Sequence, residues 1–469
     1  MASLRYINAM RRIAALAVLA SSVCAQAFDQ TDVLVNKYIA DARVPGLAFA
    51  IIKDGKVVRT GAYGLADIEN DAKVKPNSVF EIGSVTKQFT AALIMQLKEQ
   101  GKLSLSDPIS KFLPDVQDRW KNLTIQQLLN HTSGLPDYLS PLLGFSMRKD
   151  YKTTELMAIL DKKPLDFQPG SSWMYSNTGY YLMGMIIEKL TGKDYKDVLS
   201  EQIFKPLAMN DSDYLQVWKV YKNRAFGYQP ATKEYRVPET LRPSAAYSAG
   251  AIVSTAPDMA KWVIALTSGK VVKPESLKEM WEMGSLNGGR TYPYGAGWFI
   301  GEVSGHRNIH HGGNTYGCSA EVSIFPDDNV SVVILSNGAG RSFNELSIIL
   351  AAKYIPNLKP DTYKPAEKDP NRDRTMRMFE AMRSLLNSKK DPELMDAELL
   401  GLLSTQRGTM AASGLRGSVG QIKSLRFVRE RKQGIDDLVT YEIIFEKATL
   451  PMNLTVTREG KLARFDVPE

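Results

Sequence analysis

Cysteine and histidine are scarce in this sequence. Two cysteines and four histidines occur among 469 residues. Cys24 lies in a segment that we expect to be removed, which would leave Cys318 alone and exclude an internal disulfide. The histidines form no His-Glu-x-x-His pattern and none accompanies a cysteine cluster, which argues against a metallohydrolase. We therefore expect packing to stabilise the chain, and we expect neither a metal nor another cofactor.

Long apolar runs are also missing. Three arginines precede an apolar run at residues 13–23, and Ala25-Gln26-Ala27 follows with small residues at the spacing of a cleavage site. The run is too short for a bilayer core, which needs about twenty residues. Residues 1–27 are therefore predicted to be a removable signal peptide, and the mature protein is predicted to be periplasmic or secreted. Lipid attachment at Cys24 stays open, although the residues before it fit that signal poorly.

Strong charge of one sign is absent as well. The formal net charge is +8, and removing the three signal arginines leaves +5, dispersed along the mature chain. Such a mild excess argues little for nucleic acid as a partner. No later stretch is long and apolar enough to span a membrane. We expect the partner to be a small-molecule or peptide substrate, with cell-wall peptides among the candidates.

The order of expected elements indicates an α+β fold. Gly46–Ile52 and Lys56–Thr60 flank Asp54-Gly55, the pattern of an antiparallel hairpin. Residues 84–208 are rich in helical periodicity. Strands are expected again at 295–300, 321–325 and 330–335. We therefore predict an antiparallel sheet flanked by helices, with a helical insert between its first and last strands.

A separate C-terminal part is predicted after a proline-rich linker. Four prolines lie between Pro356 and Pro370, in a charged stretch with little apolar periodicity. We expect a main domain at 28–355, a linker at 356–373 and a small α+β domain at 374–469. The last opens with apolar residues at helical spacing (Met376, Phe379, Met382 and Leu385) and closes with alternating strands such as 441–445 and 454–456. It could cap a cleft, mediate dimerisation or extend the chain.

Ser84 and Lys87 form the first chemical motif. Phe89, Leu93 and Leu97 follow at helical spacing, so Ser84 is expected at a helix start with Lys87 one turn later on the same face. A serine hydroxyl becomes a good nucleophile when a neighbouring base takes its proton, and a partly desolvated lysine has a lowered pKa. The helix N-terminus would favour a developing oxyanion.

Ser-x-x-Lys alone is a weak pattern, because the chain contains it twice. The second copy is Ser146-Met147-Arg148-Lys149, which has no apolar helical continuation and is interpreted as a solvated loop. The simplest alternative for Ser84 is an ordinary helix N-cap.

Tyr175-Ser176-Asn177 is the second motif. Pro169-Gly170 precede it, and an apolar helical run at 180–190 follows. Tyr6-Ile7-Asn8 and Tyr221-Lys222-Asn223 match the same pattern, but the first lies in the expected signal and the second in a charged stretch. A loop that enters a helix is the better place to aim a phenol and an amide into a cleft.

His311-Gly312-Gly313-Asn314 is the third motif, and it enters the strand pair expected at 321–335. Glycines allow a substrate to approach an edge backbone closely, and the histidine supplies a donor above it. His310 is adjacent and leaves the register ambiguous on local grounds.

The three motifs in this order resemble those of the penicillin-recognising serine hydrolases: Ser-x-x-Lys, then Tyr-x-Asn, then Lys/His-x-Gly. The tyrosine in the second motif looks like class C β-lactamases, the Streptomyces-type D-alanyl-D-alanine peptidase and family VIII esterases. The resemblance covers about residues 30–355 and implies a β-lactamase/transpeptidase-like fold. Further similar stretches are 131–136, 253–259 and 295–298. Gly317 matches a glycine that trails the third motif, which favours His311 over His310, and His131 is interpreted as structural.

Carried over residue by residue, the resemblance implies that Ser84 attacks the carbonyl. Lys87 and Tyr175 would share the proton traffic, and which one is the immediate base stays open. Asn177 would hydrogen-bond the substrate or Lys87, with His311 and Gly313 also at the substrate site. The backbone amides of Ser84 and Asn314 would form the oxyanion hole.

One departure from the pattern bears on the substrate, because the third motif begins with histidine where most β-lactamases have lysine. This favours an esterase-like or D-amino-acid peptidase-like reaction through an acyl-serine over lactam hydrolysis. A β-lactamase or a D-Ala-D-Ala carboxypeptidase remains an alternative, as does a catalytically silent peptidoglycan- or ligand-binding protein. Three arginines near the third motif are candidates for capturing a substrate carboxylate, namely Arg290, Arg307 and Arg341.

Overall fold

The computed structural model describes residues 30–140, 145–160, 163–232, 234–360 and 363–467. The expected signal peptide at residues 1–27 lies outside these ranges. The described residues fall into two compact units, one that ends at Arg43 and one that begins at Val44. Helix α2 (Gln30–Ala42) belongs to the first unit, and the description below concerns the second. No helix within the described ranges is both long and apolar enough to cross a membrane.

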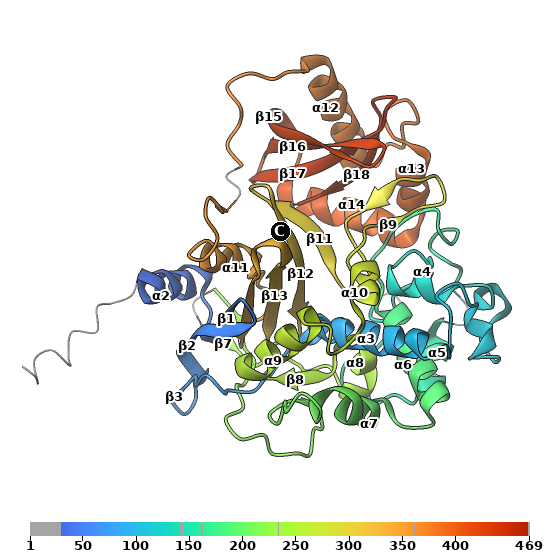
Figure 1. Ribbon diagram of the computed structural model, residues 1–469. Helices are drawn as coiled ribbons and strands as arrows, with labels where there is room; N and C mark the ends of the chain where they lie inside the picture. The colour runs from blue at the N-terminus through green and yellow to red at the C-terminus, as the bar shows by residue number, and fades with distance from the viewer. Residues whose placement is uncertain (1–29, 141–144, 161–162, 233, 361–362, 468–469) are drawn as a thin grey trace, which may run out of the picture. The chain divides into compact units, whose positions relative to one another are not determined.

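A seven-stranded antiparallel sheet forms the centre of the main part (Figure 1), with the strand order β11-β12-β13-β14-β1-β2-β3. The sheet thus combines the early strands β1–β3 with the late strands β11–β14, and the helical insert lies between them in sequence, as the α+β prediction expects. Its strands are β1 (Gly46–Lys53), β2 (Lys56–Asp67), β3 (Ala72–Lys73), β11 (Phe299–Val303), β12 (His306–Asn314), β13 (Ser319–Phe325) and β14 (Val330–Ser336).

The hairpin β1–β2 forms where the Asp-Gly pair predicts it. Asp54 and Gly55 have φ angles of +50° and +70°, and two consecutive positive φ angles are what a type I′ turn requires. Strands β13 and β14 are buried along their whole length, because both are interior strands of the sheet, and the Val-, Ile- and Leu-rich sequence of β14 suits burial on both faces. A short turn at Pro326–Asp328 joins them, also as expected.

The strand before the third motif differs from the prediction. The expected strand at 295–300 begins only at Phe299, because Gly297 has a φ of +81° and makes a close approach to the helix that carries Lys87. A Cβ at Gly297 would lie 2.9 Å from the Lys87 carbonyl oxygen. The third motif itself lies inside strand β12, which the sequence analysis does not anticipate as a strand.

Helices fill the insert and cover the sheet. Helix α3 is central, and its Phe89 ring stacks on Trp262 of α9 at 4.0 Å between centroids. Both side chains are fully buried. The helices of this part are α3 (Thr86–Glu99), α4 (Ile125–Leu129), α5 (Thr153–Leu160), α6 (Asn177–Thr191), α7 (Tyr195–Leu199), α8 (Pro243–Gly250), α9 (Ala256–Thr267), α10 (Pro274–Met280) and α11 (Asn344–Ala351).

Short strands hold the segment just before Ser84. β4 pairs with β8, which also pairs with β5, so the chain leading into the first motif is fixed by backbone hydrogen bonds. These and the other short strands are β4 (Phe80–Glu81), β5 (Asp213–Tyr214), β6 (Gln229–Pro230), β7 (Tyr235–Arg236), β8 (Ile252–Ser254), β9 (Gly284–Ser285) and β10 (Thr291–Tyr292).

The C-terminal part has its own hydrophobic core, which includes Met378, Met382 and Leu385. Its four strands form one antiparallel sheet in sequence order, drawn in red in Figure 1. The elements are α12 (Arg372–Leu386), α13 (Ala397–Ser404), α14 (Gln406–Val419), β15 (Ile422–Gln433), β16 (Asp436–Phe445), β17 (Thr449–Val456) and β18 (Leu462–Asp466). Met376, expected on the apolar face of the first helix, is 53% exposed, and Met378 is buried there instead. The division into a main domain, a linker and a C-terminal domain stays a prediction, since the described residues from Val44 onward form one compact unit.

Candidate active site

Ser84 lies in a single 3-10 turn, Gly83–Val85, that leads directly into helix α3. The sequence therefore places it correctly at a helix start. Gly83 has a φ of +51°, and a Cβ there would come within 2.8 Å of the Asn314 backbone nitrogen. Only glycine fits this position without strain, and its fit brings the first and third motifs together.

Lys87 is fully buried and reaches three acceptors. Its Nζ lies 3.1 Å from Ser84 Oγ, 2.8 Å from Asn177 Oδ1 and 2.9 Å from the Ala249 carbonyl oxygen. Burial lowers the pKa of Lys87 to about 7, against the charge of Asp137, which acts in the opposite direction. A large fraction of this lysine is therefore neutral near pH 7, which is the form that can accept a proton.

Tyr175 and Asn177, from the second motif, also contact Lys87. The Tyr175 ring centroid is 4.9 Å from Lys87 Nζ and 4.3 Å from the ring centroid of His131. Asn177 is the first residue of α6, and both its backbone nitrogen and its Nδ2 donate to Asp137 Oδ2, at 3.2 and 3.0 Å. The first two motifs thus meet around the amino group of Lys87.

His311 projects from β12 towards the same cluster. Its Nδ1 lies 2.6 Å from the Gly312 carbonyl oxygen, and its Nε2 lies 3.0 Å from the Tyr294 hydroxyl. A carbonyl only accepts, so Nδ1 carries the proton and Nε2 accepts from Tyr294. Burial, with a smaller effect of the Lys87 charge, lowers the pKa of His311 to about 3. The imidazole is neutral and uses both nitrogens inside the protein, so in this arrangement it orients Tyr294 and offers the cleft no N–H.

His310 faces elsewhere, as alternation along a strand requires. Its ring stacks on Phe299 at 5.6 Å between centroids, and its Nδ1 lies 3.4 Å from Glu321. The following backbone is packed tightly against the first motif, because a Cβ at Gly313 would lie 1.9 Å from the Ile82 carbonyl oxygen. The structure therefore places His311 with the other motif residues and His310 away from them.

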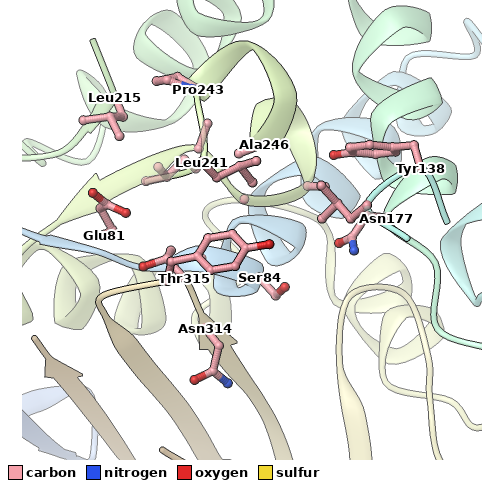
Figure 2. A pocket seen from close by; sticks show the side chains of 17 residues that line it. Glu81, Ser84, Tyr138, Asn177, Leu215, Leu241, Pro243, Ala246, Asn314 and Thr315 are labelled. Carbon is pink, nitrogen blue, oxygen red and sulfur yellow. The ribbon is translucent and has the colours of Figure 1, made fainter. Parts of the chain in front are cut away.

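A cavity of about 260 Å³ opens beside Ser84 (Figure 2). Ser84 and Asn314 lie on the same side of it, whereas Asn177 and Glu81 lie at opposite ends. Most of the lining is apolar, from residues such as Leu139, Leu215, Leu241, Pro243, Ala246 and Ile252. Among the described lining residues Glu81 is the one carboxylate, and no lysine or arginine takes part. Burial raises the pKa of Glu81, and Arg224, at 3.4 Å, opposes that effect.

The three arginines considered for carboxylate capture are not among the described residues that line this cavity. Arg290 pairs with Asp396, Glu398 and Asp436 of the C-terminal part. Arg307 donates to the Trp281 carbonyl. Arg341 is absent from the described residues that line the cavity, as the other two are.

The second copies of the motifs also lie apart from the site. Ser146 is exposed in an irregular segment, as its sequence predicts. The Tyr221 hydroxyl bonds the Asp213 carboxylate at 3.2 Å, and the Asn223 side chain accepts from Lys75. Tyr6-Ile7-Asn8 falls outside the described residues.

Several neighbours of the site are not identified by the sequence analysis. Asp137 directly follows the stretch 131–136, which resembles the family, and this position is a weak indication in the sequence that Asp137 lies near the site. Tyr247 has a φ of +41°, unusual for an aromatic residue, and this kink in α8 precedes the Ala249 carbonyl that accepts from Lys87. Arg407, from the C-terminal part, donates to the Tyr175 carbonyl at 2.8 Å and had no signal.

An antiparallel sheet with a helical insert, and a serine at the head of the central helix, define a protein with the β-lactamase/transpeptidase-like fold. The Beta-lactamase family matches residues 31–354, and the chain belongs to that family. Proteins of this family are generally serine hydrolases.

Three relatives illustrate the range of similarity. Penicillin-binding protein 4* of Bacillus subtilis (strain 168) is 30% identical over 323 residues, which are 64% of this chain and 70% of that protein. The structure of a D-stereospecific amidohydrolase from Streptomyces sp. is 28% identical, with a TM-score of 0.56, over 66% of this chain and 94% of that one. The octameric penicillin-binding protein homologue from Pyrococcus abyssi shares the fold, with 22% identity and a TM-score of 0.61, over 92% and 97%. This last structural match covers 92% of the chain, whereas the family match ends at residue 354.

Proposed function

We propose that this chain is an exported hydrolase that cleaves an amide or an ester through an acyl-serine intermediate. The observation that carries the proposal is the 3.1 Å contact between Ser84 Oγ and Lys87 Nζ, a buried amine whose pKa is lowered to about 7. Neutral Lys87 is suited to take the hydroxyl proton as the serine attacks. Export rests on the signal peptide expected at residues 1–27.

The proposed acylation begins when Ser84 Oγ bonds to the substrate carbonyl carbon and its proton passes to the pair of Lys87 and Tyr175. We expect the backbone N–H groups of Ser84 and Asn314 to stabilise the oxyanion, and the position of both residues in the cavity lining supports this role. Collapse of the tetrahedral intermediate breaks the bond to the amine or alcohol, which leaves with the proton. A water molecule then attacks the acyl-serine and gives a proton to the same pair, which returns a proton to Ser84 Oγ as the bond to the acyl carbon breaks and the acid is released. Asn177 holds Lys87 through its Oδ1.

The cavity beside Ser84 favours acyl groups with an apolar side chain and a free amine. Its lining is mostly apolar and carries the Glu81 carboxylate at one end, which suits an ammonium group. One relative of similar structure is a D-stereospecific amidohydrolase. We therefore propose D-amino-acid amides, esters or short D-peptides as the substrate class.

The cavity supports the other candidate functions less well. A D-Ala-D-Ala carboxypeptidase needs a cation for the terminal carboxylate, and no lysine or arginine is among the described lining residues. His311, in place of a lysine at the third motif, provides no cation for a lactam carboxylate while its pKa is near 3. A catalytically silent binding protein does not require a buried lysine such as Lys87, because burial that lowers the pKa of a lysine also lowers the stability of the folded protein.

The experiment compares Ser84→Ala with Ser146→Ala, which removes the serine of the exposed second copy of the motif. A panel of p-nitrophenyl esters, D-amino-acid amides, D-alanyl-D-alanine peptides and nitrocefin identifies the substrate, and a fluorophosphonate probe reports acylation. We expect Ser84→Ala to lower kcat by about a thousandfold or more and to abolish labelling, with no change in Ser146→Ala. Near-normal turnover in Ser84→Ala would place the nucleophile elsewhere.

A further inference from the structure

Side chains of the C-terminal part hold the segment that leads into Tyr175. Glu398 of α13 accepts from Ser172 Oγ at 3.0 Å. The guanidinium of Arg464, in β18, lies 4.5 Å from the ring centroid of Trp173. Arg407 of α14 donates through Nη2 to the Tyr175 carbonyl oxygen at 2.8 Å. Three different elements of this part therefore contact three of the four residues 172–175, the segment that leads into the second motif.

The C-terminal part is fixed against the main part next to these contacts. Arg290 places its half-buried guanidinium among three carboxylates, 2.6 Å from Asp396, 2.6 Å from Glu398 and 2.5 Å from Asp436. Charge-assisted hydrogen bonds of this kind are strong and directional. Glu398 accepts from both Arg290 and Ser172, so the ion cluster and the Tyr175 segment share one carboxylate.

Backbone contacts from His131 and Arg407 hold the chain at Tyr175, in addition to the ring contacts of Tyr175 with Tyr294 and His311. His131 holds the residues on either side of Tyr175, because Met174 N donates to the His131 carbonyl at 3.1 Å and Ser176 N donates to His131 Nδ1 at 3.2 Å. Arg407 holds the carbonyl of Tyr175 itself. The ring then lies between His131 and Lys87, with distances of 4.3 and 4.9 Å. Removing the Arg407 side chain takes this donor from the Tyr175 carbonyl, so the peptide group next to the ring can reorient and change the distance between the ring and Lys87.

We propose that the C-terminal part is a structural component of the active site, and that Arg407 is a positioning residue that sets Tyr175 against Lys87. Arg407 is not among the described residues that line the cavity beside Ser84, so it acts on the geometry of proton transfer and not on substrate affinity. A displacement of about 1 Å in a catalytic group costs up to about a hundredfold in rate. The inference rests on the proposed function, in which Tyr175 takes part in proton transfer.

The test uses the full chain with Arg407→Ala, Arg407→Lys and the control Arg416→Ala, which removes an exposed arginine of the same helix. kcat and KM are measured on the best substrate of the panel, and the fluorophosphonate labelling rate is measured in parallel. We expect Arg407→Ala to lower kcat and the labelling rate by about tenfold or more, with KM within about twofold. Arg407→Lys, which keeps a donor and a charge, is expected to recover most of the loss. Arg416→Ala is expected to match the wild type.

A merely structural role would give a different result. Equal kcat in Arg407→Ala and Arg416→Ala, or a loss confined to KM, would overturn the proposal. If Arg407→Ala does not fold in a thermal melt, Arg464→Ala decides, with an expected severalfold loss of kcat at unchanged KM and with unchanged kcat as the contrary outcome. Each result for an Arg407 or Arg464 variant is a ratio to the wild-type activity. Failure of the proposed function is detected separately, by near-normal turnover in Ser84→Ala.

Discussion

Replacing Asp137 by asparagine should shift the pH dependence of acylation to lower pH. An ordinary lysine, with a pKa near 10.4, is neutral in only about 4 molecules in 10,000 at pH 7. Burial lowers the pKa of Lys87 to about 7, which makes about half of it neutral there. Because we propose that neutral Lys87 takes the proton of Ser84, we expect the rate of labelling to rise with pH and to reach half its maximum near pH 7.

Asp137 opposes this lowering because its negative charge favours the ammonium form. Its Oδ2 accepts from Asn177 Nδ2 at 3.0 Å, and Asn177 Oδ1 accepts from Lys87 at 2.8 Å, so one amide separates the two charges. Unit charges roughly 6 Å apart interact by about 3 kcal/mol at an effective dielectric constant of about 20. Asp137→Asn keeps an acceptor oxygen and removes the charge, so the midpoint should fall by about half a pH unit to two pH units.

The assay follows pseudo-first-order labelling by a fluorophosphonate between pH 5 and 9. Asp166→Asn is the matched control, because Asp166 is a partly buried carboxylate that interacts electrostatically with Asp137 but does not shift the pKa of Lys87. Its profile should coincide with that of the wild type. An unchanged or higher midpoint in Asp137→Asn would refute the assignment of Lys87 as the group that titrates.

Two further substitutions test the cavity and the junction of the motifs. Glu81→Gln should lower kcat/KM about tenfold for substrates with a free amine and little for p-nitrophenyl esters without one, because it removes the carboxylate and leaves Arg224 uncompensated; equal losses on both classes would argue against amine recognition. Gly313→Ala should lower the free energy of unfolding, measured by urea titration, by about 1–3 kcal/mol and abolish labelling, because its Cβ would lie 1.9 Å from the Ile82 carbonyl oxygen. The control Gly301→Ala places a Cβ no closer than 3.7 Å to a neighbour, so its free energy of unfolding should stay close to that of the wild type.

The sequence predicts the local parts of this structure well. Ser84 and Lys87 are one helical turn apart, so their contact follows from the geometry of a single helix. The Asp54-Gly55 turn is likewise set by the backbone freedom of two adjacent residues. Both predictions need only neighbours in the chain.

Predictions that depend on distant packing are less complete. Strand β12 has a polar sequence without apolar alternation, and its identity as a strand comes from pairing with β11 and β13. Arg407 is 232 residues from Tyr175, and nothing in its local sequence distinguishes it from other arginines. The third motif was located by sequence, but the use of both His311 nitrogens within the protein depends on Tyr294, which only the fold brings near.

Strand β1 lies between its sequence neighbour β2 and the distant β14. Ser336 Oγ donates to the Gly46 carbonyl across 290 residues of chain, so during synthesis the first strand has no partner on one edge until almost three hundred further residues have been made. Such long-range pairing slows folding and exposes an unpaired edge meanwhile. The same arrangement makes residues 74–298 one long insert between strands of a single sheet, so surface loops of the insert can change length without altering the register of that sheet.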